Sequence, residues 1–299
     1  MAARTRLGVW WRMLRPFTLV ASVAPVLGGT ALAYAEGGFH TGRFCAFLLA
    51  AILIQSATNM FNEYFDYVRG LDTREHVGIA GTIVRDGVSP RLVISLAWAF
   101  LGTAVALGLY IAATSSWWVF GVGLLCLGVA FLYSGGPLPL SSTPLGELAA
   151  GLFMGPVMIV LIYYTQALRV TATAVWVAVP IGLMIGAILL ANNIRDIEAD
   201  RAGGRHTLPI VLGRTAAVGV LAGAFVLAYG VTLGLVAAGR LSPWALLVLL
   251  SLPSAVRPVR LFLREREPAR LHPAVKGVAQ VLARFGALLV LGLLLSVWV

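Results

Sequence analysis

Residues 44–73 read F-C-A-F-L-L-A-A-I-L-I-Q-S-A-T-N-M-F-N-E-Y-F-D-Y-V-R-G-L-D-T. The stretch begins as a long apolar run and ends in a cluster of acidic side chains, with Glu63, Asp66 and Asp72 close together. A helix that crosses the hydrocarbon core of a bilayer needs about 20 mainly apolar residues. The stretch therefore predicts a transmembrane helix that carries acidic groups to one membrane face.

The rest of the chain is equally apolar. Of its 299 residues 60% are hydrophobic and 11% are charged, whereas soluble proteins are about 25% charged. The apolar runs are continuous, as helices in lipid require, and do not alternate as barrel strands do. We expect an all-α integral membrane protein with nine transmembrane helices, at approximately residues 16–35, 44–63, 92–112, 117–134, 146–167, 174–194, 215–238, 243–262 and 278–298.

The first run also has features of a cleavable signal peptide, namely a basic lead-in and an A-x-A triplet at residues 33–35. It is long enough to span, however, and it carries Arg15 and Pro16 at its start. We therefore expect it to be retained as the first helix.

The positive charges are distributed unevenly between the two membrane faces. With nine helices, 19 of the 22 Lys and Arg residues lie on the side of the N-terminus, which leaves Arg43, Arg169 and Arg240 opposite. Cytoplasmic loops carry such an excess, so we expect the N-terminus and the acidic loops to be cytoplasmic in a multi-pass protein of the cell membrane. Because the net charge of +10 comes from these loops, it indicates membrane topology and not nucleic-acid binding.

A second acidic segment follows the sixth apolar run. Residues 192–205 read N-N-I-R-D-I-E-A-D-R-A-G-G-R, and they repeat the N-x-x-x-D spacing of Asn62 and Asp66. Five of the twelve carboxylates lie between Glu63 and Asp86, and three more lie in this second segment. We call residues 59–73 the first acidic segment and residues 192–205 the second acidic segment.

The two segments have the composition of a metal and pyrophosphate site. Residues four apart share a helix face, so each segment would present Asn and Asp oxygens together. Mg²⁺ binds one or two carboxylates and completes its coordination with water and substrate phosphates, and guanidinium groups bind phosphate oxygens. The alternative is a pair of ordinary solvated loops whose charges neutralise each other. We expect the first interpretation, with the arginines interleaved among these acids as the phosphate-binding cations.

These residues resemble the two aspartate-rich motifs of the UbiA superfamily of intramembrane prenyltransferases. G-L-D-T at 70–73 and N-N-I-R-D at 192–196 are most similar to the branch that prenylates 1,4-dihydroxy-2-naphthoate on the way to menaquinone. Further similar stretches are R-P-F-T-L-V-A-S-V-A-P-V at 15–26, Y-S-G-G-P at 133–137, L-G-E-L at 145–148, Y-Y-T-Q at 163–166 and L-H-P-A-V-K-G-V-A-Q at 271–280. The resemblance covers most of the chain, so we expect one domain over residues 1–299.

The resemblance implies nine helices around a central cavity that opens sideways to lipid. Mg²⁺ would bind the pyrophosphate of a polyprenyl donor, and the naphthoate ring would attack the allylic cation with loss of CO₂. The metal role is carried over to Asn62, Asp66, Asp72, Asn192, Asp196 and Asp200, of which the four aspartates would be catalytic. Arg69, Arg195 and Arg205 would bind pyrophosphate.

The prenyl and aromatic parts of the site are harder to assign. Tyr64, Tyr133 and Tyr163 are candidates, since an aromatic face attracts a carbocation, although each could simply be packed. Glu147 could reach the cavity or pair within a loop. Two positions depart from the family pattern, since Glu63 replaces the usual Asp and Leu138 stands where a Lys is common.

Other interpretations stay open at this point. The acceptor could instead be 4-hydroxybenzoate, homogentisate, haem or a glycerol phosphate lipid, because the metal motifs are shared. From a different class, a secondary transporter also gathers acids in a membrane bundle, but near the midplane and not at one face. The prenyl chain length and the oligomeric state do not follow from the sequence.

Overall fold

The computed structural model describes residues 6–72 and 81–298, and in this part of the chain the regular structure is helical throughout. The helices group into two compact units. Unit 1 comprises Met1–Leu19 and Ala46–Leu140, and unit 2 comprises Val20–Cys45 and Ser141–Val299.

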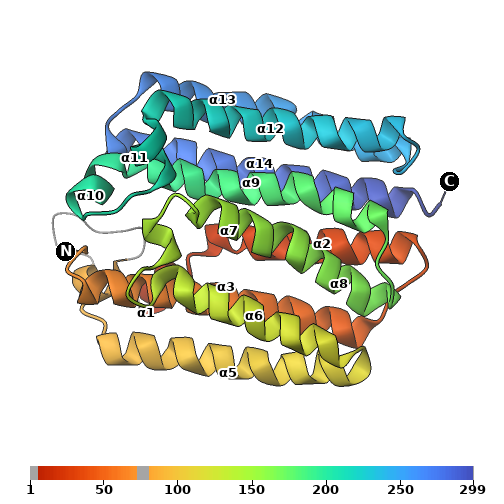
Figure 1. Cartoon of the computed structure of the whole chain (residues 1–299), viewed down its shortest axis with the longest axis horizontal. Helices are drawn as coiled ribbons and strands as arrows, with labels where there is room; N and C mark the ends of the chain where they lie inside the picture. The colour runs from red at the N-terminus through yellow and green to blue at the C-terminus, as the bar shows by residue number, and fades with distance from the viewer. Residues whose placement is uncertain (1–5, 73–80, 299) are drawn as a thin grey trace. The chain divides into compact units, whose positions relative to one another are not determined.

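Unit 1 is built from long helices on either side of the 73–80 segment. Its core joins the end of α3 to α5, with Met60, Phe61, Val93 and Ala97 buried. Helices α5 and α6 run side by side (Figure 1). The elements are α1 (Arg6–Leu14), η1 (Pro16–Thr18), most of α3 (Thr41–Val68), α4 (Thr82–Asp86), α5 (Pro90–Thr114) and α6 (Trp117–Ser134), with η2 (Leu140–Ser142) at the boundary.

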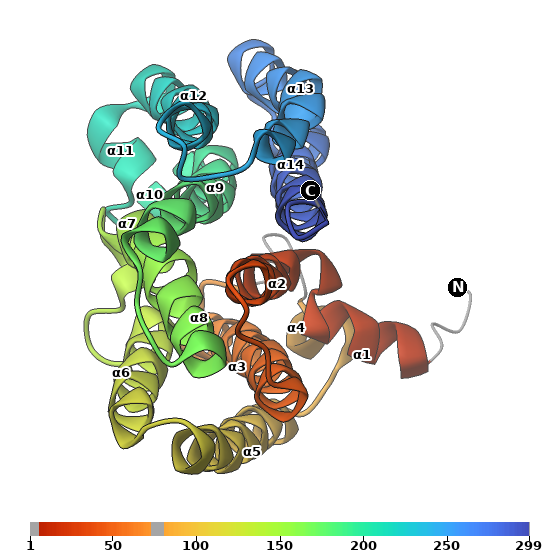
Figure 2. The ribbon, with the colours of Figure 1, turned by 90° about the vertical axis from the view of Figure 1, so that its right-hand side faces the viewer.

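Unit 2 is arranged around α9, the most buried of the candidate membrane spans that the structure describes. Helices α12 and α14 pack against α9, and α13 packs against α14, as the end-on view in Figure 2 shows. The elements are α2 (Val20–Ala35), α7 (Gly146–Leu152), η3 (Phe153–Val157), α8 (Met158–Ala167), α9 (Ala172–Arg195), α10 (Ile197–Ala202), α11 (Leu208–Leu212), α12 (Arg214–Ala237), η4 (Pro243–Ser251), α13 (Leu252–Arg264) and α14 (Pro268–Leu295).

The predicted all-α membrane fold is confirmed. Among the described residues, eight helices are long and apolar enough to cross a membrane, and the count rises to nine if the pair Gly8–Thr18 and Val20–Ala35, bent by 51°, forms one span. The break falls at the start of the first predicted run, where Pro16 opens a 3-10 turn and Arg15 has a left-handed φ of 48°. The predicted central cavity and its opening to lipid stay predictions.

Two predicted boundaries were wrong in a way that matters for the site. The helix predicted at 44–63 continues to Val68, so Asp66 lies on α3 together with Asn62 and Glu63. The helix predicted at 278–298 starts ten residues earlier, at Pro268, which places His272 on α14. Loss of hydrophobicity marks the end of the bilayer and not the end of the helix, because polar residues can continue the helical hydrogen bonding in water.

Prolines and glycines shape the spans of unit 2. The span Gly146–Ala167 is π-helical over Phe153–Val157, around Pro156, because proline lacks the N–H that α-helical hydrogen bonding needs. At the same level Gly155 faces α9 so closely that an added Cβ would lie 2.3 Å from the Cα of Gly182. The span therefore packs backbone to backbone on α9, as small residues allow in lipid.

Candidate active site

The first acidic segment lies on the last turns of α3 and just beyond them. Glycine ends the helix: Gly70 has φ +71°, and the N–H of Leu71 donates to the carbonyl of Asp66 over 2.9 Å, as in a Schellman turn. The N–H of Asp72 reaches the same carbonyl at 3.3 Å. The turn therefore brings Asp66 and Asp72 together at the C-terminal end of α3, where the helix dipole favours a cation.

The asparagines of this segment connect α3 to the N-terminal residues of unit 1. Asn59 donates through Nδ2 to the carbonyl of Leu14 (3.2 Å) and to Oγ1 of Thr18 (3.0 Å). Oδ1 of Asn62 accepts from Nη1 of Arg15 at 3.1 Å. Side-chain hydrogen bonds thus join the first acidic segment to Leu14, Arg15 and Thr18, at the bend that follows α1.

Glu63 has a structural role in this arrangement. It is 1% exposed, and its Oε1 accepts from Oγ1 of Thr82 (2.7 Å) and from the N–H of Ile83 (2.9 Å). Glu63 thereby attaches the first turn of α4 to α3, and the longer Glu side chain spans the distance. This departure from the family pattern therefore concerns a buried residue that supports α4.

Arg69, predicted to bind pyrophosphate, is engaged with backbone carbonyls. Nη1 donates to Ser134 O (2.8 Å) and Nη2 to Gly136 O (3.0 Å), and its guanidinium carbon lies 5.4 Å from the ring centroid of Phe65. Arg69 thus holds the Y-S-G-G-P turn, which contains Tyr133, against the end of α3. Its predicted contact with phosphate stays a prediction.

The second acidic segment lies at the C-terminal end of α9 and on α10. Asp196 stands between the two helices, yet its N–H donates to Asn192 O (3.0 Å) and its carbonyl accepts from the N–H of Asp200 (2.8 Å). Because the four-residue hydrogen bonds cross the junction, Asn192, Asp196 and Asp200 remain one turn apart, as the spacing predicts.

Arginines accompany the aspartates of this segment. The Arg195 guanidinium binds the Asp196 carboxylate through two hydrogen bonds, Nε to Oδ1 at 2.7 Å and Nη2 to Oδ2 at 2.5 Å. Arg195 is 8% exposed, and its Nη1 lies 3.4 Å from Nδ1 of His272 on α14. Nη1 of Arg205 donates to Oδ1 of Asp200, which is 6% exposed, at 3.0 Å. Each predicted phosphate-binding cation here lies beside a predicted metal ligand.

Sequence reasoning missed two supports of this segment. Arg214, at the start of α12, donates through Nη1 to Ile194 O (3.1 Å) and through Nη2 to Phe262 O (3.2 Å) and Glu265 O (2.6 Å). It thereby ties the ends of α9 and α13 together. An Arg in the first turn of a helix, where the dipole disfavours a cation, was the available signal. The second support is Asn193, whose Nδ2 donates to Oε1 of Glu147 at 2.8 Å.

Two of the candidate tyrosines, Tyr64 and Tyr163, lie in different surroundings. Tyr64 packs edge-on against Phe65, with ring centroids 5.4 Å apart. Tyr163 is fully buried, and its hydroxyl donates to Glu36, which also pairs with Arg169. The pKa of Arg169 is raised, chiefly by its interaction with Tyr163 and then by the charge of Glu36. This cluster adjoins the N-terminal end of α9, about 36 Å from the second acidic segment at 1.5 Å per residue over 24 residues.

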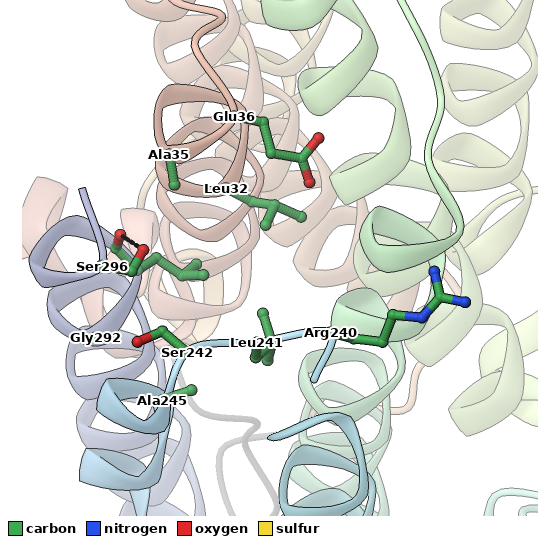
Figure 3. A pocket seen from close by; sticks show the side chains of 10 residues that line it. Leu32, Ala35, Glu36, Arg240, Leu241, Ser242, Ala245, Gly292 and Ser296 are labelled. Carbon is green, nitrogen blue, oxygen red and sulfur yellow. Dashed lines mark hydrogen bonds between the residues drawn. The ribbon is translucent and has the colours of Figure 1, made fainter. Parts of the chain in front are cut away.

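A small cavity of about 140 Å³ lies at the same remote end of unit 2 (Figure 3). Its lining comes from the end of α2, the connection between α12 and η4, and the end of α14, and it includes Glu36, Arg240 and Leu241. Because the second acidic segment lies at the opposite end of α9, this cavity is separate from that segment.

The oxygen atoms of the two segments suit a hard divalent cation. Asn192 donates through Nδ2 to Ile188 O at 3.1 Å, and its buried Oδ1 has no hydrogen-bond partner among the described residues. In that part of the chain no three His, Cys, Asp or Glu side chains gather into a complete metal site. Mg²⁺ takes few protein carboxylates and completes its coordination with water and substrate phosphates. That the two segments, one in each unit, face each other stays a prediction.

Comparison with known proteins identifies the family. Residues 22–277 match the model of the UbiA prenyltransferase family. The chain belongs to this family. It is 45% identical over 288 residues to the 1,4-dihydroxy-2-naphthoate octaprenyltransferase of Bacillus subtilis. The aligned region covers 96% of this chain and 93% of that relative. The proteins of the same name from Mycobacterium tuberculosis and Escherichia coli are 35% and 31% identical, covering 84% and 98% of this chain and 86% and 97% of their own lengths.

Solved UbiA structures share the fold. A UbiA homologue from Aeropyrum pernix superimposes with a TM-score of 0.70 at 17% identity, over 90% of this chain and 97% of that one. A homologue from Archaeoglobus fulgidus bound to GPP and Mg²⁺ gives a TM-score of 0.60 at 16% identity, over 94% of this chain and 99% of that one. The protein is therefore a multi-pass membrane prenyltransferase of the UbiA family.

Proposed function

We propose that this UbiA-family protein transfers a polyprenyl group from polyprenyl pyrophosphate to 1,4-dihydroxy-2-naphthoate. CO₂ and pyrophosphate are released, and the product is demethylmenaquinol, an intermediate of menaquinone biosynthesis. The observation that carries this proposal is the 45% identity, over 96% of the chain, to a relative that bears the name of this activity. Family membership leaves the transporter alternative without support, and the other acceptors remain outcomes of the test.

The site residues are proposed from the geometry of each segment. Asp66 and Asp72, together at the end of α3, and Asp196 and Asp200, one turn apart across the α9–α10 junction, would hold Mg²⁺ with Asn62 and Asn192. When bound, Mg²⁺ would neutralise charge on the departing pyrophosphate. The Mg²⁺ seen with a UbiA homologue of the same fold supports this choice of metal.

The arginines would divide into supports and phosphate ligands. Arg195 is buried and bidentate on Asp196, so we propose that it first orients this carboxylate. Arg205 and Arg69 would bind the pyrophosphate through their positive charge, one from each acidic segment. The aromatic candidates for the prenyl cation remain Tyr64, near the end of α3, and Tyr133, next to the turn that Arg69 holds. Tyr163 is the weakest candidate, because its hydroxyl binds Glu36.

We further propose that both units work as one domain over residues 1–299, and that both acidic segments face the cytoplasm of a cell with this protein in its plasma membrane. The test uses a variant without Cys45 and Cys126 that carries either Arg201→Cys or Arg240→Cys, two exposed positions. A membrane-impermeant maleimide added to intact cells should label position 240 and spare position 201. The reverse pattern would overturn the orientation.

The activity test is direct. Membranes that contain the protein are incubated with labelled farnesyl pyrophosphate, Mg²⁺ and one acceptor at a time. We expect a prenylated product with release of CO₂ from 1,4-dihydroxy-2-naphthoate, and none from 4-hydroxybenzoate or homogentisate. Product from another acceptor and none from dihydroxynaphthoate would overturn the proposal.

A further inference from the structure

Glu147 is a buried carboxylate that the roles assigned so far do not use. It lies in the first turn of α7 and is 6% exposed. Its Oε1 accepts the 2.8 Å hydrogen bond from Asn193. Its Oε2 is buried and has no hydrogen-bond partner among the described residues. A buried carboxylate oxygen without a donor is costly, since its lost hydration is not replaced.

The position of Glu147 is set by close packing between the backbones of α7 and α9. Helix α7 packs on α9 through glycines: an added Cβ on Gly151 would lie 2.9 Å from Gly182 O, and one on Gly186 would lie 3.1 Å from Glu147 O. Such close backbone contact means that α7 cannot move nearer to α9, and this packing is lost if α7 moves away. The carboxylate is therefore held beside Asn193, which is itself the neighbour of Asn192.

This placement brings Glu147 to the second acidic segment from a different helix. Asn193 and Asp196 are three residues apart, on neighbouring positions of the helical turn. The free oxygen thus lies at the end of unit 2 that carries the proposed metal ligands. A donor from outside the described chain would satisfy this oxygen, and a carboxylate selects a hydroxyl or N–H over another anion.

We propose that Oε2 of Glu147 accepts a hydrogen bond from a ring hydroxyl of the aromatic acceptor, which makes Glu147 an acceptor-binding residue. This inference rests on the proposed function. A dihydroxynaphthoate offers two hydroxyl donors and one carboxylate, and the charge of Glu147 repels the carboxylate, so one of the hydroxyls faces Glu147. A hydroxyl bonded to an anion also releases electron density into the ring, which favours attack on the allylic cation.

The test compares acceptors in wild type and in Glu147→Gln. The amide keeps an oxygen for Asn193 and replaces Oε2 with a donor, so the KM for the acceptor should rise roughly 10- to 100-fold, as expected for a charged hydrogen bond. The KM for the prenyl pyrophosphate should not change. Wild type should also discriminate against 1-hydroxy-2-naphthoate or 4-hydroxy-2-naphthoate, whichever lacks the bonded hydroxyl, and this discrimination should shrink in Glu147→Gln.

Glu36→Gln is the matched control, because it removes a carboxylate from the remote end of the same unit, and it should leave the acceptor KM unchanged. If Glu147→Gln does not fold, Glu147→Asp, which keeps the charge but shortens the reach, should raise the acceptor KM by a smaller factor. An unchanged acceptor KM in the folded variant would overturn the inference while the proposed function stands. Failure of wild type to prenylate dihydroxynaphthoate would instead overturn the function.

Discussion

The guanidinium of Arg195 donates two hydrogen bonds, of 2.7 and 2.5 Å, to the carboxylate of the next residue, Asp196. This pair sits where α9 ends, and Arg195 is 8% exposed, so the cation is a buried partner of the acid. A bidentate Arg–carboxylate pair fixes the orientation of the carboxylate as well as its distance. Arg195 therefore orients one of the proposed metal ligands.

We predict that Arg195→Lys weakens the response to Mg²⁺, because a lysine cannot form the bidentate pair. Loss of a partner that orients a metal ligand raises the metal concentration for half-maximal activity roughly 10- to 100-fold. The measurement is prenyl transfer as Mg²⁺ is titrated. Arg201→Lys is the control, since Arg201 pairs with an exposed Glu198 on α10 and surface pairs contribute little. A higher KM for prenyl pyrophosphate at unchanged Mg²⁺ dependence would instead make Arg195 a phosphate ligand.

Glu63→Asp should destabilise the protein although it restores the residue usual in the family. The shorter side chain cannot reach Thr82 Oγ1 and the N–H of Ile83 together, which lie 2.7 and 2.9 Å from Glu63 Oε1. Two buried donors left unsatisfied cost about 1–3 kcal/mol each. Thermal unfolding in detergent measures the loss, and Glu198→Asp, at a side chain 82% exposed, is the control. An unchanged melting temperature would mean that α4 does not depend on Glu63.

Gly155→Ala should disrupt the contact between the α7–α8 span and α9. The new Cβ would lie 2.3 Å from the Cα of Gly182, which is backbone that cannot rotate aside, and overpacking costs about 1–3 kcal/mol or more. The yield of monodisperse protein and its melting temperature should both fall. Gly223→Ala, on α12 with nothing within 4 Å of the added Cβ, should be neutral. Equal behaviour of the two variants would contradict the backbone contact.

The membrane helices could be predicted from apolar runs, because lipid imposes length and composition on each span. The end of α3 could not, since its last turns are polar, and the donors that bury Glu63 lie 19 and 20 residues away in the sequence. The four-residue spacing of Asn192, Asp196 and Asp200 was readable because it is local. The partners of Arg69 and Arg214 could not be predicted, because they are backbone carbonyls of distant segments. Every residue has such a carbonyl, so the sequence does not single these out.

The account rests on the claim that the two acidic segments hold the metal for prenyl transfer. The most direct measurement is Mg²⁺-dependent formation of prenylated product from labelled farnesyl pyrophosphate and dihydroxynaphthoate by folded Asp66→Asn, Asp196→Asn and Glu198→Gln proteins. Loss of several kcal/mol of metal stabilisation predicts a fall of about 100-fold or more for the two aspartate variants. Glu198→Gln, in the same segment but exposed, should retain wild-type activity. Full activity of Asp66→Asn and Asp196→Asn would contradict the account.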